Sequence, residues 1–90
     1  MLSGSTEDKR VRFAAVQIYA RTAGKGGDAI LAKVLDGEKD GFILKSTIEH
    51  LLRRGAGREI QPRLHEIAKD ESMPPNARQA AVWALAQLNK

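Results

Sequence analysis

The chain contains no cysteine among its 90 residues, which excludes disulfide bonds and thiolate metal sites. Aromatic residues make up only 4% of it, so alanine, leucine and isoleucine must fill most of any core. No stretch approaches the roughly 20 apolar residues of a membrane-spanning helix, and the first ten residues lack the apolar segment of a signal peptide. No segment alternates with the period of a strand. We therefore expect a soluble, cytoplasmic, all-α protein without a metal ion or cofactor.

A helical pattern occurs three times along the chain at almost constant spacing. The segments are VRFAAVQIYARTAG (residues 11–24), ILKSTIEHLLRRGA (43–56) and ARQAAVWALAQLNK (77–90), and their first residues lie 32 and 34 positions apart. A fixed period in this range is typical of stacked helical hairpins that bury their apolar faces against their neighbours. The length allows one domain, residues 1–90, and we expect residues 1–6 to be flexible.

Five helices are predicted from apolar periodicity and from residues that begin or end helices. They cover about residues 7–23, 28–35, 42–54, 58–69 and 72–88. Ser5 or Thr6 caps the first helix, the loop at residues 24–27 ends it, and Asp28 caps the second. Alignment of the three long helices predicts core positions at Val16, Ile48 and Val82, at Tyr19, Leu51 and Leu85, and at Ala15, Thr47 and Ala81.

Two of the aligned segments share a short motif at the start of the long helix. The motif is an apolar residue, arginine, two further residues and alanine, and it occurs at Val11-Arg12 with Ala15 and at Ala77-Arg78 with Ala81. In this respect the chain resembles HEAT repeats, in the short form also found in bilin-lyase-like repeat proteins. In that family a turn aspartate precedes the motif.

The resemblance implies a short α-solenoid of HEAT-like hairpins, with five helices and about two and a half repeats. It also implies that Asp70 and Arg78 form one rung of a ladder between repeats. The middle unit departs from the pattern, because Leu44 and Thr47 replace the expected arginine and alanine. A plain five-helix bundle with similar spacing is the alternative.

One stripe of the three long helices is mostly polar and is expected to face water. The resemblance implies that these inner helices line a concave binding face, so the stripe is the candidate protein-binding surface. Its aromatic residues either anchor an interface or cover the atypical units at the ends of the array. The stripe comprises Phe13, Gln17 and Arg21, then Lys45, Glu49 and Arg53, and finally Gln79, Trp83 and Gln87.

The turns that follow the long helices are basic, whereas the turns that precede them are rich in acids. Bases favour helix C-termini and acids favour N-termini, which is one explanation. The other is a basic edge that binds nucleic-acid phosphates, although the net charge is only +4. The candidate phosphate contacts on this edge are Lys25, Arg53, Arg54 and Arg58.

No catalytic motif emerges from the sequence. The loop at residues 24–27 lacks the spacing of a phosphate-binding loop and is better explained as a helix end. His65 begins a zinc-protease-like motif, but Lys69 stands where the second histidine is required. His50 aligns with Ile18 and Ala84, which predicts partial burial rather than a catalytic base.

We therefore predict a non-catalytic interaction or scaffold module that binds another protein through the inner-helix face. Nucleic-acid binding through the basic edge is the alternative. The first helix has no outer partner in the array, which leaves self-association through this terminal helix open as well.

Overall fold

Helices account for nearly all of the described chain. The computed structural model describes residues 9–21 and 25–89, and within these ranges it contains five α-helices, one 3-10 helix and no strand. The prediction of an all-α chain with five helices is thus confirmed. In chain order the elements are α2 (Lys9–Arg21), α3 (Lys25–Gly37), α4 (Gly41–Arg53), η1 (Gly57–Ile60), α5 (Gln61–Lys69) and α6 (Pro75–Leu88).

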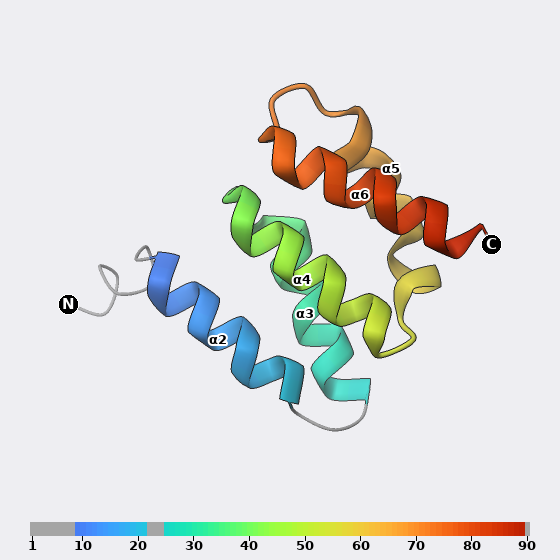
Figure 1. Cartoon of the computed structure of the whole chain (residues 1–90). Helices are drawn as coiled ribbons and strands as arrows, with labels where there is room; N and C mark the ends of the chain where they lie inside the picture. The colour runs from blue at the N-terminus through green and yellow to red at the C-terminus, as the bar shows by residue number, and fades with distance from the viewer. Residues whose placement is uncertain (1–8, 22–24, 90) are drawn as a thin grey trace.

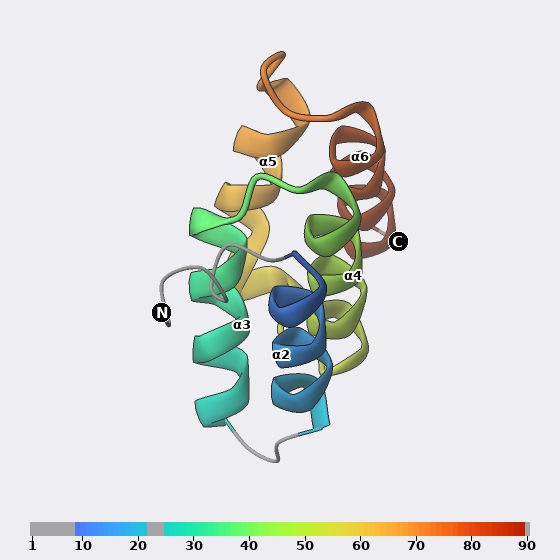
Figure 2. The ribbon, with the colours of Figure 1, turned by 90° about the vertical axis from the view of Figure 1, so that its left-hand side faces the viewer.

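The helices form two layers, as Figures 1 and 2 show. Helices α2, α4 and α6 lie side by side in one layer, with α4 between the other two, and α3 and α5 form the second layer. Helix α3 packs on α2 and α4, and α5 packs on α6. The Cα atoms extend 44 × 32 × 15 Å, and the smallest extent fits two layers at the usual interaxial distance of about 8–10 Å.

The core lies between the two layers and is built from aliphatic side chains. Helix α6 contributes only alanines to it, and these small side chains let α6 approach α4 and α5 closely. The fully buried residues include Leu31 and Leu35 of α3, Leu44, Ile48 and Leu51 of α4, Leu64 and Ile67 of α5, and Ala77, Ala81 and Ala84 of α6.

Five of the nine aligned core positions are buried, three are half-buried, and one, in α6, is exposed. Val16 and Ile48 are 1% and 0% exposed, as predicted, whereas Val82 is 56% exposed. The reason is that α2 and α4 each pack against a following helix of the same layer, whereas the described chain places no helix beyond α6 (Figure 1). Of the other six predicted core residues, Thr47, Leu51 and Ala81 are buried, and Ala15, Tyr19 and Leu85 are half-buried.

Helix α3 begins three residues earlier than predicted. Lys25 and the two glycines that follow it are helical rather than part of a loop. Asp28 lies in the first turn of α3, and its carboxylate accepts a hydrogen bond from Nε of Arg54. Asp28 therefore lies inside α3 and pairs with Arg54 at the end of α4, so the predicted role of Asp28 as an N-cap is wrong.

The same helix extends two residues beyond its predicted end, to Gly37. The last carbonyl groups of a helix need donors from outside it. Here the Arg63 guanidinium supplies them, since it donates to the carbonyl oxygens of Leu35 and Asp36 at 3.3 Å. The exposed Asp36 carboxylate lies 3.7 Å from the same guanidinium.

Glycine ends α4 as predicted, but the next helix starts differently. Gly55 has a φ of 81°, a conformation that glycine adopts without steric cost. The helix predicted for residues 58–69 begins as the 3-10 turn η1, and α5 starts only at Gln61. Pro62 explains the change, because it has no N–H to donate to the carbonyl of Arg58 four residues earlier. The predicted caps at Ser5 and Thr6, the loop residue Gly24 and residues 1–6 lie outside the described ranges.

The predicted rung between Asp70 and Arg78 is absent. The Asp70 carboxylate accepts hydrogen bonds from the backbone N–H and the hydroxyl of Ser72, at 2.9 and 2.6 Å, and these bonds lower the pKa of Asp70. Arg78 instead donates from Nε to the Met73 carbonyl at 3.2 Å. Both groups are therefore used within the α5–α6 turn.

A different ion pair connects successive hairpins. Glu38, in the turn between α3 and α4, is buried and accepts hydrogen bonds from Nε and Nη2 of Arg12 at 2.8 and 3.1 Å. It also accepts from the backbone N–H groups of Lys39 and Asp40, at 3.1 and 2.9 Å. Asp40 in turn caps α4 by accepting from the first free N–H groups of that helix. One carboxylate thus holds α2, the turn and the start of α4 together.

Replacing this carboxylate by an amide should weaken the fold. Glu38→Gln keeps the size of the side chain but removes the charge-assisted bonds, so we expect the free energy of unfolding to fall by about 1–3 kcal/mol. Glu71→Gln makes the same charge change at an exposed site and should stay within about 0.5 kcal/mol of wild type. Urea unfolding followed by circular dichroism measures both. Equal stabilities for the two variants would contradict the role given to Glu38.

Gly41 should tolerate no side chain, because α6 lies against it. An added Cβ would lie 2.9 Å from Cβ of Pro74 and would also overlap the Asn76 side chain. We expect Gly41→Ala to reduce the free energy of unfolding by about 1–3 kcal/mol through overpacking. At Gly37 no atom lies within 4 Å of the added Cβ, so Gly37→Ala should be neutral or stabilise by up to about 1 kcal/mol. Thermal unfolding of the two variants tests this contrast.

Candidate protein-binding face

The exposed side of α2, α4 and α6, which we call the three-helix face, carries most of the predicted stripe. Two adjoining grooves run along it, one between α2 and α4 and one between α4 and α6. Seven of the nine predicted residues line these grooves: Phe13, Gln17, Lys45, Glu49, Arg53, Gln79 and Trp83. The remaining two do not: Arg21 is exposed at the end of α2, and Gln87 is half-buried in the last turns of α6.

The groove between α2 and α4, the α2/α4 groove, has a volume of about 280 Å³. At one place the rings of Phe13 and Phe42 lie against each other, with their centroids 5.0 Å apart and their planes tilted by 37°. Further along, Nε2 of Gln17 donates to Oγ of Ser46 at 3.2 Å. Aromatic packing and a polar bridge therefore fix the two helices relative to each other, so that the groove has preformed walls.

The groove between α4 and α6, the α4/α6 groove, has a volume of about 320 Å³. Lys45 and Glu49 separate it from the first groove, with Nζ of Lys45 3.8 Å from Oε2 of Glu49. On the other side stands Trp83, which is 47% exposed. Buried Ala80 lies between the two walls, and its small side chain leaves the space open. A charged ridge thus stands between two grooves that each have an aromatic wall.

Five residues that line the grooves were missed by the sequence analysis: Phe42, Ser46, His50, Asn76 and Ala80. Phe42 is 58% exposed and lies one turn before Ser46, which itself lies one turn before His50. Residues four apart share one side of a helix. This second stripe, adjacent to the predicted one, was the available signal in the sequence.

His50 sits at the edge of the α2/α4 groove and is half-buried, as predicted. Its pKa is lowered, first because burial disfavours the imidazolium and second because the positive charges of Arg53 and Arg54 do the same. The carboxylate of Glu49 acts in the opposite direction. Burial and the two neighbouring arginines therefore disfavour the charged form of His50 on this face.

The predicted basic edge is only partly available for binding. Arg54 points inward: its Nε donates to Asp28 and its Nη1 donates to the Ala20 carbonyl at 2.8 Å. Arg53 is exposed, and Arg58 is exposed with Nη2 donating to the Leu88 carbonyl at 3.5 Å. The side chain of Lys25 lies outside the described set. At least one of the four predicted phosphate contacts thus belongs to the packing of α3 against α4.

The described residues contain neither a cluster of metal ligands nor a membrane-spanning helix. Nowhere in them do three histidine, aspartate or glutamate side chains converge as a metal ion would require. None of the described helices is both long enough and apolar enough to cross a membrane.

No protein-family model matches the chain, and neither a curated protein nor a solved structure shows significant similarity to it. The resemblance to HEAT repeats therefore rests on the sequence segments alone and stays a prediction.

The titration of His50 tests whether the charged groups placed around it on the three-helix face lie where the structure puts them. We expect its pKa to lie below the usual value of about 6.5 and to rise when Arg53→Gln removes a nearby positive charge. Because the folded state has the lower pKa, protonation favours unfolding, so this contribution to stability is present above about pH 6.5 and is lost as the pH falls below it. NMR titration of the His50 ring protons measures the shift. Arg58→Gln serves as the control, and an equal change in both variants would contradict the assignment.

Proposed function

We propose that this protein is a non-catalytic interaction or scaffold module that binds another protein through the three-helix face. The observation that carries the proposal is the gathering of seven stripe residues around two adjoining grooves. Sequence positions 13, 45 and 79, which come from three different helices, all border these grooves. A surface that combines aromatic side chains with a polar rim is typical of protein-binding sites.

The chemistry of the face suits a polypeptide partner. Protein interfaces are commonly anchored by aromatic and arginine side chains in well-packed pockets. The face offers Phe13 with Phe42 in one groove, Trp83 in the other, and Arg53 at the edge of the first. Between them, the Lys45–Glu49 ridge presents both signs of charge. A partner segment crossing α2, α4 and α6 would place one apolar side chain in each groove and hydrogen-bonding groups over the ridge.

We further propose that the two layers are a short α-solenoid of the HEAT type. The resemblance of the segments and the alternation of inner helices α2, α4 and α6 with outer helices α3 and α5 support this assignment. In a solenoid each unit contacts only its neighbours, so the inner helices present a continuous surface. That arrangement explains why one helical stripe, repeated three times, forms a single face.

Nucleic-acid binding is the weaker alternative. Of its four proposed contacts, only Arg53 and Arg58 are described as exposed, and Arg54 is held in an ion pair with Asp28. A phosphate-binding surface needs several uncompensated cations together. The two grooves of the three-helix face, by contrast, are formed without Arg54. The packing of Arg54 therefore favours a protein partner.

A capture experiment with matched variants tests the proposal. Immobilised wild-type protein is compared with the double variant Arg53→Ala/Trp83→Ala, and Arg58→Ala is the control for loss of an exposed arginine outside the face. We expect wild type and control to recover the same partner protein and the double variant to recover at least about tenfold less, since hot-spot losses commonly exceed about 2 kcal/mol. Circular dichroism verifies that each variant is folded.

Nuclease treatment of the extract separates the two candidate functions. Recovery that survives the nuclease and depends on the face supports a protein partner. Recovery that is lost with the nuclease, or that is equal for wild type and the double variant, would sink the proposed function.

A further inference from the structure

The two ends of the α2–α4–α6 row expose apolar side chains at positions that the other helices bury. Val11 begins the first repeated segment and is 47% exposed, whereas Ile43 and Ala77, which begin the other two, are 1% and 0% exposed. One helical stripe continues this side of α2, since Ile18, seven residues on, is 64% exposed. Helix α2 therefore carries an apolar side like the one that α4 and α6 bury, and within the described chain no helix precedes it in the row.

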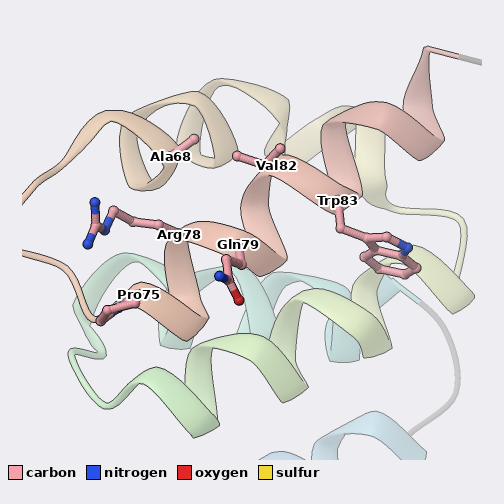
Figure 3. Close-up of a pocket in the computed structure, with 6 residues that line it drawn as sticks. All are labelled: Ala68, Pro75, Arg78, Gln79, Val82 and Trp83. Carbon is pink, nitrogen blue, oxygen red and sulfur yellow. The ribbon is translucent and has the colours of Figure 1, made fainter.

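Helix α6, at the opposite end of the row (Figure 1), also exposes an apolar side chain. Val82 takes the register position of Val16 and Ile48 but is 56% exposed, whereas those two are buried. It stands in a hollow of about 470 Å³, which we call the end groove. Figure 3 shows Val82 on the side of α6 toward Ala68 of α5, while Gln79 and Trp83 extend toward α4. The end groove is lined by Ala68, Pro75, Arg78, Gln79, Val82 and Trp83.

We propose that copies of this chain associate head to tail, with the Val11 and Ile18 side of α2 from one copy seated in the end groove of the next. The end groove shares Gln79 and Trp83 with the α4/α6 groove, whereas Val11, Ile18 and Val82 line neither groove of the proposed binding face. Substitutions at Val11 and Val82 therefore test this contact separately from that function. It would continue the row, because α2 of the second copy would follow α6 as α6 follows α4.

The repeated sequence identifies a second copy as the occupant. Within the molecule, the position of Val11 is used at the contact between successive helices: Ile43 of α4 lines a hollow together with Phe13 of α2. A second copy offers the same type of side chain at the same place on a matching helix. Among the described residues that line the end groove, Arg78 alone is charged, and it donates to the Met73 carbonyl. The stripe of α2 would therefore meet a largely apolar surface.

The geometry of the contact determines the size of the assembly. The side of α2 and the end groove are different surfaces, so the contact is heterologous. Because it continues the row and does not close a ring, each assembly keeps one free surface of each kind. Growth is then open-ended and depends on concentration. The contact involves few side chains, so we expect weak association in the micromolar to millimolar range.

Two charge substitutions, one at each end, test the proposal by complementation. Val11→Lys and Val82→Lys replace exposed residues, so both variants should fold, which circular dichroism verifies. By sedimentation velocity, wild type should rise above its monomer mass of 9.9 kDa as concentration increases, whereas each variant alone should stay monomeric. An equimolar mixture should form one-to-one dimers and nothing larger, because the Val11→Lys copy retains the end groove and the Val82→Lys copy retains α2.

Other outcomes would overturn the proposal. Monomeric wild type at every concentration removes it. Association of either variant alone would indicate contacts between identical surfaces instead. Arg53→Glu on the three-helix face is the control and should associate like wild type; if it alone were monomeric, the binding face rather than the ends would hold the copies together.

Discussion

The arrangement of the molecule depends on where one buried carboxylate finds its donors. Glu38 accepts from the Arg12 guanidinium and from two backbone N–H groups, so the charge is compensated on the side of α2 and on the side of the turn. A buried carboxylate without such partners would be strongly unfavourable. The Glu38 carboxylate therefore joins the turn that starts α4 to α2, and these two helices form the walls of the α2/α4 groove.

Two further arginines act in the same way at helix ends. Arg54 joins α4 to Asp28 of α3 and to the last turn of α2, and Arg63 joins α5 to the last carbonyls of α3. Each guanidinium satisfies groups that a helix cannot satisfy itself. Arg54 was predicted to contact phosphates, but it connects the two layers of the fold instead, which leaves fewer cations for a phosphate-binding edge.

Local patterns predicted much of the fold, and long-range contacts account for what they missed. Apolar periodicity identified the five helices, and Gly55 marked the end of α4, because both depend on neighbours within one or two turns. The bounds of α3 depend on Arg54 and Arg63, which lie more than 20 residues away, so no local signal revealed them. The stripe of the face was predictable since residues four apart share a helix side. The exposure of Val82 was not, because alignment with Val16 and Ile48 shows the register of a residue but not whether another helix packs against it.

The single tryptophan of the chain occupies an unusual place. Trp83 borders both the α4/α6 groove and the end groove, with nearly half of its surface in water. An indole so placed emits at longer wavelength than one withdrawn from solvent. Filling either groove should therefore shift its emission to shorter wavelength and reduce the access of dissolved quenchers to the ring. The protein carries its own spectroscopic label at the junction of its two candidate contact surfaces.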